Sequence, residues 1–157
     1  MAAGIEAAVR IAVLNGPNLN LLGTREPALY GRATLRDVET GVARLAAELG
    51  VEVECAQVNG EGQLVDLVHG LRGRADGVVI NAGAYSHTSL ALRDALVGVG
   101  LPYVEVHVTN VYAREPERQH SMLASSAVGV VVGLGTDGYG LALRGLVSVL
   151  RARDSRP

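Results

Sequence analysis

The chain has 157 residues, of which 48% are hydrophobic and 19% are charged, and its formal net charge at pH 7 is −2. These values are typical of one folded domain and exclude a disordered or fibrous chain. They also exclude nucleic acid as an electrostatic partner, because the sequence contains no block of Lys or Arg.

The hydropathy of the chain favours a soluble protein. No apolar run approaches the ~20 residues that a membrane span needs, so we expect no membrane contact. Residues 1–10 lack the basic and then apolar layout of a secretory signal, so we expect a cytoplasmic location. We expect one domain over residues 1–157, with short flexible ends at about 1–8 and 153–157.

Five short apolar runs alternate with helix-like segments along the chain. The runs are rich in β-branched residues and bounded by Gly, Asn or Pro, which predicts strands at 10–15, 51–56, 77–82, 102–107 and 127–133. Capping and stop residues predict helices at 34–50, 62–74, 89–100 and 138–154. The alternation predicts an α/β fold: a flavodoxin-like, doubly wound, five-stranded parallel sheet in three layers.

Polar residues gather just after the predicted strands, at 15–30, 59–61, 81–89 and 105–118. The carboxyl ends of parallel strands lie at one edge of the sheet, where open α/β sheets bind ligands. We therefore expect a ligand site at this edge.

The first of these segments carries Arg25 and Tyr30 in a long loop of small and amide residues. A tyrosine has an ordinary pKa near 10, so ionising it at pH 7 requires roughly 4 kcal/mol, and a neighbouring cation lowers that requirement. The pair therefore suits a tyrosinate base. The alternative is a surface arginine beside a tyrosine that anchors the loop.

Glu105 and His107 lie two residues apart on a predicted strand, so they share one face. A carboxylate in that position bonds one imidazole nitrogen and leaves the other for general acid or base catalysis. The alternative is a polar pair at a strand end. A zinc site needs a third ligand, for which only His87 is placed, and we expect no metal.

The segment 81–89 leads from the third strand into a helix. Asn81 is placed to bond a ligand hydroxyl, and Ser86, Thr88 or Ser89 is placed to cap the helix that follows. His87 stands at the helix entrance, and Asp94 lies two turns further, about 10 Å away. Asp94 is therefore either a solvated helix residue or a contributor to a neighbouring subunit's site.

The stretch "GLGTDG" at 133–138 matches the dinucleotide-binding pattern of glycines. That pattern needs a further strand and an acidic residue about 20 positions on, and this sequence has neither. We expect these glycines to form a tight turn into the last helix.

Four stretches together resemble type II 3-dehydroquinate dehydratase: "NGPNLNLLGTREPALYG", "INAGAYSHTSLALRDA", "VEVHVTNVYAREPERQHS" and "GVVVGLGTDGYGLAL". They follow in order over roughly residues 11–150. The resemblance implies conversion of 3-dehydroquinate to 3-dehydroshikimate by anti elimination of water through an enolate, with no cofactor. A lysine imine is excluded, because all fourteen basic residues are Arg.

The resemblance also implies roles for residues at matching positions. Tyr30 is the base, and Arg25 keeps it ionised and holds a mobile loop closed. Asn18 stabilises the enolate oxygen through a water molecule. His107 protonates the departing hydroxyl, and Glu105 orients His107.

The remaining implied roles concern substrate binding and assembly. The residues with binding roles are Val108 and Thr109, through backbone amides to the carboxylate, and Asn81, His87 and Arg118, through hydroxyl contacts. Asp94 reaches the site of an adjacent subunit, in a homo-oligomer that is a dodecamer of trimers. Arg114 adds positive charge near the loop, which we expect to move without losing core contacts.

Three alternative functions fit the sequence less well. A phospho-receiver domain needs acidic residues where Asn15 and Asn81 stand, and a flavin carrier needs aromatic residues in a chain with no Trp or Phe. An inactive homologue would lack Tyr30, Arg25 or His107. Gly60, Tyr112 and Glu117 depart from the family's usual residues and alter the rim of the site or subunit contacts.

Overall fold

The computed structural model describes residues 7–24 and 26–156. All its strand pairings are parallel, and they form one sheet with the order β2-β1-β3-β4-β5. The strands are β1 (Arg10–Asn15), β2 (Glu52–Gln57), β3 (Gly77–Asn81), β4 (Tyr103–His107) and β5 (Gly129–Val132). This order is that of flavodoxin-like sheets, so the predicted fold class is confirmed.

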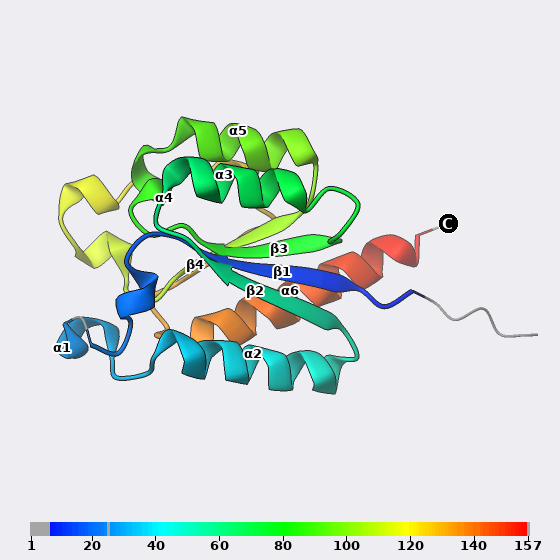
Figure 1. Cartoon of the computed structure of the whole chain (residues 1–157), viewed down its shortest axis with the longest axis horizontal. Helices are drawn as coiled ribbons and strands as arrows, with labels where there is room; N and C mark the ends of the chain where they lie inside the picture. Colours follow the sequence, from blue (N-terminus) through cyan, green and yellow to red (C-terminus); the bar gives the residue numbers. More distant parts are fainter. Residues whose placement is uncertain (1–6, 25, 157) are drawn as a thin grey trace, which may run out of the picture.

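Helices cover both faces of the sheet, which gives the three predicted layers (Figure 1). On one face lie α2 (Leu35–Leu49) and α6 (Asp137–Asp154), and on the other lie α3 (Glu61–Gly70) and α5 (Leu90–Val99). Two four-residue helices, α1 (Pro27–Tyr30) and α4 (Tyr85–Thr88), follow β1 and β3 at the edge where those strands end.

The helix ends follow from local chemistry. Thr34 caps α2 in a reciprocal box, because its hydroxyl accepts from the Asp37 amide at 3.1 Å and its own amide donates to the Asp37 carboxylate at 2.9 Å. Ser89 caps α5 by accepting from the Leu92 amide at 2.9 Å. Helix α3 ends at Gly70, four residues before the predicted end, and the chain then turns through Gly73 at φ 76°.

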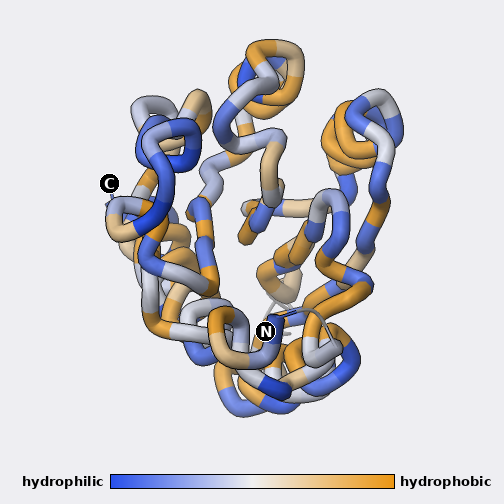
Figure 2. The backbone as a smooth tube through the Cα atoms, turned by 90° about the vertical axis from the view of Figure 1, so that its left-hand side faces the viewer, coloured by the Kyte–Doolittle hydropathy of each residue, from blue (hydrophilic) through white to orange (hydrophobic). Residues whose placement is uncertain are grey.

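Two apolar cores lie between the sheet and its helices, one on each face of the sheet. Val79 and Leu143 belong to the α2/α6 side, and Ile80 and Leu92 belong to the α3/α5 side. In Figure 2 the helices carry apolar residues on one side and polar residues on the other, as helices that cover a sheet should. Within residues 7–24 and 26–156, no helix combines the length and the apolar character of a transmembrane span.

The long loop after β1 differs from its prediction in two ways. Leu19 and Leu22 are buried in the core that α2 covers, with exposed fractions of 9% and 5%. The expectation that the whole loop moves without losing core contacts is therefore wrong for this part of it. Tyr30 lies at the end of helix α1, where the sequence predicted an irregular loop.

Candidate active site

The predicted site lies at the edge where β1, β3 and β4 end, on the left of Figure 1. Gly16 lets the loops after β1 and β3 approach each other there. Its amide donates to the Asn81 carbonyl at 2.8 Å, and a Cβ at Gly16 would lie 2.5 Å from the Ala82 carbonyl oxygen. Only glycine permits this contact, because real Cβ atoms do not come within 3.0 Å of backbone oxygen.

Glu105 and His107 form the carboxylate–imidazole bond that their spacing predicted. His107 Nε2 lies 2.7 Å from Glu105 Oε1, Glu105 is fully buried and His107 is 6% exposed. Because a carboxylate oxygen accepts, Nε2 carries the proton of this bond. The ring nitrogen left for a ligand is therefore Nδ1.

Ser121 also bonds Glu105, and the sequence analysis missed it. Its hydroxyl lies 2.6 Å from Glu105 Oε1, while the second carboxylate oxygen, Oε2, has no hydrogen-bond partner in the described part of the chain. Ser121 ends the third quoted stretch, "VEVHVTNVYAREPERQHS", which was the only signal available in the sequence.

His87 stacks on His107, with ring centroids 5.8 Å apart and planes inclined by 22°. Its Nδ1 lies 2.8 Å from the His120 carbonyl oxygen, so Nδ1 donates and Nε2 is left as the acceptor of the neutral ring. Burial is the largest influence on His87 and lowers its pKa, although the bond to the His120 carbonyl acts in the opposite direction. The structure thus favours a neutral His87 beside His107.

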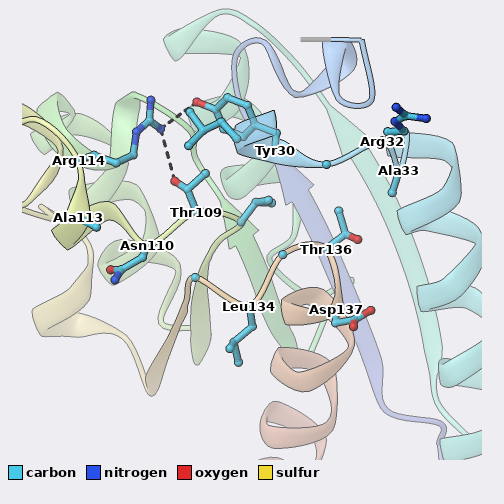
Figure 3. Close-up of a pocket in the computed structure, with 15 residues that line it drawn as sticks. Tyr30, Arg32, Ala33, Thr109, Asn110, Ala113, Arg114, Leu134, Thr136 and Asp137 are labelled. Atoms are coloured by element: carbon cyan, nitrogen blue, oxygen red, sulfur yellow. Dashed lines mark hydrogen bonds between the residues drawn. The ribbon is translucent and has the colours of Figure 1, made fainter. Parts of the chain in front are cut away.

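Tyr30 lies at the end of α1, where Arg114 contacts its hydroxyl. The Arg114 guanidinium donates to the Tyr30 hydroxyl at 2.8 Å, lies 5.4 Å from the centre of the Tyr30 ring, and contacts the Thr109 hydroxyl at 3.4 Å (Figure 3). Arg25, the predicted activating cation, lies outside the described residues. The sequence analysis gave Arg114 only a supporting role, and its contact with the phenol makes it a central residue of the site.

A pocket of about 560 Å³ adjoins this contact. Tyr30, Val108, Thr109 and Arg114 line one part of it, and the turn at 133–137 lines another, as Figure 3 shows. His87 and His107 do not line this pocket, so it represents the Tyr30 side of the candidate site.

Asn81 turns both ends of its amide toward the protein. Its Nδ2 donates to the Tyr139 hydroxyl at 2.9 Å and its Oδ1 accepts from the Gly83 amide at 3.2 Å. The Tyr139 hydroxyl in turn donates to Asn15 Oδ1 at 2.6 Å, and burial raises the pKa of Tyr139. The buried Tyr139 therefore fixes Asn81, a contact that no sequence pattern indicated.

Asn18, a predicted catalytic residue, is exposed, and Arg118, a predicted binding residue, is partly exposed. Asn18 adopts a left-handed conformation with φ 69°, and its amide donates to Asn59 Oδ1 at 3.0 Å. The Arg118 Nε donates to Glu115 Oε1 at 2.6 Å.

Asp94 lies exposed on α5, whereas His87 lies on α4. The two residues do not lie on one continuous helix, as the predicted separation of about 10 Å assumed, because the chain leaves helical geometry at Ser89 (φ −95°, ψ 95°). The partners of the two imidazoles are His120 and Glu105, and Asp94 is not among them.

The glycine-rich stretch at 133–138 forms the predicted turn. Gly133 and Gly135 have φ values of 83° and 65°, and the Gly135 amide donates to the Val108 carbonyl at 3.0 Å. The turn therefore holds the backbone of Val108. In residues 7–24 and 26–156, no three His, Cys, Asp or Glu side chains are grouped as metal ligands.

The fold and this cluster define an α/β protein with acid–base side chains at the carboxyl edge of its sheet. The family model described as dehydroquinase class II matches residues 9–147. A protein of Gemmatimonas aurantiaca named 3-dehydroquinate dehydratase is 59% identical over 91% of this chain and 94% of its own length. Catabolic 3-dehydroquinase 2 of Aspergillus flavus is 62% identical over 85% of this chain and 89% of its own length.

Solved structures agree. The crystal structure of the type II dehydroquinase from Propionibacterium acnes superposes with a TM-score of 0.85 at 41% identity, covering 90% of this chain and 99% of that one. The chain belongs to the class II dehydroquinase family. It is an enzyme of the hydro-lyase class.

Proposed function

We propose that this enzyme removes water from 3-dehydroquinate to give 3-dehydroshikimate by anti elimination through an enolate. One observation carries the proposal: two proton-transfer groups, Tyr30 and His107, each have a charged or polar partner at the same edge of the sheet. Family membership supplies the substrate, because the named relatives are 3-dehydroquinate dehydratases.

In the first step, the Tyr30 phenolate takes the proton from the carbon beside the ketone, and the electron pair forms an enolate. The guanidinium of Arg114 donates to the Tyr30 hydroxyl at 2.8 Å and so holds the base in place. In the proposal, Arg25 keeps Tyr30 ionised and holds the mobile loop closed. Asn18 stabilises the enolate oxygen through a bound water molecule.

In the second step, the enolate returns to a ketone, the carbon–carbon double bond forms, and the bond to the tertiary hydroxyl breaks. His107 gives a proton to this hydroxyl, which leaves as water. Glu105 holds the proton on Nε2 of His107, so His107 acts as the imidazolium, gives up the proton of Nδ1 and is left as the neutral Nε2–H ring. No step in this scheme calls for a metal or an organic cofactor.

Binding uses groups on either side of the reacting carbons. Backbone amides of Val108 and Thr109 hold the substrate carboxylate, supported by the turn that bonds the Val108 carbonyl. Asn81, His87 and Arg118 contact the hydroxyls. The neutral His87 accepts through Nε2, since its Nδ1 is committed to a backbone carbonyl.

Assembly belongs to the same proposal. Asp94 is exposed on α5 and is not among the partners of the two imidazoles, which supports a role in an adjacent subunit's site. We infer a dodecamer of trimers, with a mass about twelve times the 16.3 kDa of one chain, which light scattering measures. A single catalytic domain over residues 1–157 and a cytoplasmic location complete the proposal.

The product is a conjugated enone, so ultraviolet absorbance after addition of 3-dehydroquinate tests the function directly. We expect a continuous rise with the purified enzyme. The matched control is His107→Asn, which keeps a polar side chain of similar shape and removes the acid. No rise with the wild-type enzyme, at concentrations that turn over a known relative, would refute the proposal.

A further inference from the structure

A four-residue segment, 120–123, contacts the His87 imidazole and the carboxylate that bonds the His107 imidazole. The His120 carbonyl accepts from His87, the Ser121 hydroxyl lies 2.6 Å from Glu105, and the Met122 amide donates to the Ser86 carbonyl at 2.7 Å. The Leu123 carbonyl accepts from the Tyr103 hydroxyl, and the Leu123 side chain is fully buried. The segment is therefore fixed by its own contacts, and it reaches His87 directly and His107 through Glu105.

The Ser121 hydroxyl has one acceptor for its proton, the Glu105 carboxylate. Its oxygen already accepts two backbone amides, from Leu123 at 3.0 Å and Ala124 at 3.1 Å. A hydroxyl has two lone pairs and one proton, so with both lone pairs used its proton is donated to Glu105 Oε1. The two amides thus fix the direction of the bond.

Glu105 Oε1 consequently accepts from two donors, Ser121 and His107 Nε2. Oε2 is buried and has no partner in the described chain, so these two bonds hold the carboxylate. If Ser121 is removed, a fully buried carboxylate keeps one donor and is free to turn about its side chain. The position of the Glu105 oxygen that bonds His107 Nε2, and with it the tautomer of His107, is then no longer fixed.

We propose that Ser121 is a positioning residue that locks Glu105, and through it the Nε2–H tautomer of His107. His87 is locked separately, because its partner is the backbone carbonyl of His120. The inference rests on the proposed function for its effect on turnover, where Nδ1 of His107 faces the reaction. Its effect on the tautomer is independent of any substrate.

The test is solid-state ¹⁵N NMR of the full-length, histidine-labelled enzyme, without substrate and at a pH where the ring is neutral. His107→Asn assigns the signals of His107. We expect wild-type His107 to carry its proton on Nε2 alone, and Ser121→Ala to show a mixture of tautomers. The His87 signals, with the proton on Nδ1, should stay unchanged and serve as the internal control.

Steady-state kinetics with 3-dehydroquinate complete the test. Ser121→Ala should lower kcat about tenfold or more with KM within about twofold, since a hydrogen bond to a charged group is lost. Ser121→Thr keeps the hydroxyl and should restore both the tautomer and kcat. Ser125→Ala makes the same change at an exposed position nearby and should behave as wild type.

Two results would overturn the inference: a single Nε2–H tautomer in Ser121→Ala, whatever happens to kcat, or a Ser121→Thr enzyme that folds yet shows mixed tautomers. A fall in kcat without a tautomer change would mean that Ser121 only shapes the turn. Failure of the proposed function is recognised separately, as a wild-type enzyme that does not dehydrate 3-dehydroquinate while the NMR result stands.

Discussion

At the scale of single residues, the chemistry proposed for the site depends on which group contacts each of the two proton-transfer residues, Tyr30 and His107. Arg114 occupies the position beside the Tyr30 hydroxyl, with its charge 5.4 Å from the ring centre. Arg114 is itself only partly exposed, so solvent screens this charge less than it would screen one on the open surface. The phenol hydroxyl is thus in direct contact with a fixed positive charge.

We expect Tyr30→Phe to remove nearly all turnover while substrate binding survives. The substitution deletes only the hydroxyl that takes the proton, so KM or a binding constant should change little and kcat should fall by about 10²-fold or more. Kinetics and calorimetric titration measure the two effects. Tyr112→Phe, the same change at a side chain that is 62% exposed, is the control. A Tyr30→Phe enzyme with substantial kcat would refute the assignment of the base.

His87 makes the stability of the protein depend on pH in a predictable direction. Burial outweighs the opposing bond to the His120 carbonyl and lowers the pKa of His87 in the folded state, so the unfolded state binds this proton at higher pH. The contribution of the neutral ring is present above the ordinary pKa of about 6.5 and is lost as pH falls below it. Wild type should therefore lose more stability than His87→Gln between about pH 7.5 and about pH 5.5.

Urea unfolding at fixed protein concentration measures this difference, because both enzymes share every other titrating group. Parallel pH profiles for wild type and His87→Gln would contradict the pKa direction and with it the neutral ring proposed to bind substrate.

The sequence predicted the elements of this site better than its contacts. Glu105 and His107 lie on one strand, and the alternation of side chains alone places them on one face. The bond between Arg114 and Tyr30 joins residues 84 positions apart, and the bond between Tyr139 and Asn15 joins residues 124 apart. Periodicity carries no information about which long side chain spans such a distance, so these partners needed the structure.

At the scale of elements, the short apolar runs predicted the strands because each is rich in β-branched residues and bounded by turn residues. The central strands β1, β3 and β4 are buried along nearly their whole length, whereas β2 and β5 are partly exposed. Strand β1, for example, runs from Arg10 to Asn15 as predicted. The helices were less certain at their ends. The predicted entrance to the helix that starts at Ser89 contains a separate short helix, α4, which ends at Ser89. The backbone of Ser89 is not helical, and its side chain caps α5, so the two helices are distinct.

Gly16 gives a prediction about how two of these elements meet. Gly16→Ala should destabilise the protein by about 1–3 kcal/mol, because its Cβ would overlap the Ala82 carbonyl oxygen and force β1 and β3 apart where they end. Activity should fall as well, since Asn81 lies at that junction. Chemical unfolding and the absorbance assay measure the two effects.

Gly41→Ala is the matched control, because nothing lies within 4 Å of a Cβ at that exposed position of α2. It should leave stability unchanged or raise it by up to about 1 kcal/mol through helix propensity. Equal stability of the two alanine variants would show that the loops after β1 and β3 tolerate a wider separation.

At the scale of the whole molecule, one buried hydroxyl ties the last helix to the middle of the sheet. Tyr139 lies in the first turn of α6 and bonds two side chains, one at the end of β1 and one at the end of β3, so its hydroxyl joins three segments distributed over the chain. The Asn15 Nδ2 group is already without a hydrogen-bond partner among the described residues. The junction therefore has no spare partner with which to replace a lost bond.

We expect Tyr139→Phe to lower the free energy of unfolding by about 2–4 kcal/mol, although it removes one oxygen atom. Two hydrogen bonds disappear, and Asn15 Oδ1 and Asn81 Nδ2 stay buried without them. Urea unfolding should show a lower midpoint at an unchanged slope, because the fold and the exposed surface are the same. Tyr85→Phe, which loses one solvent-accessible bond to the Asn59 carbonyl, should cost about 1 kcal/mol or less. A Tyr139→Phe protein as stable as Tyr85→Phe would mean that the three segments are held together by apolar packing alone.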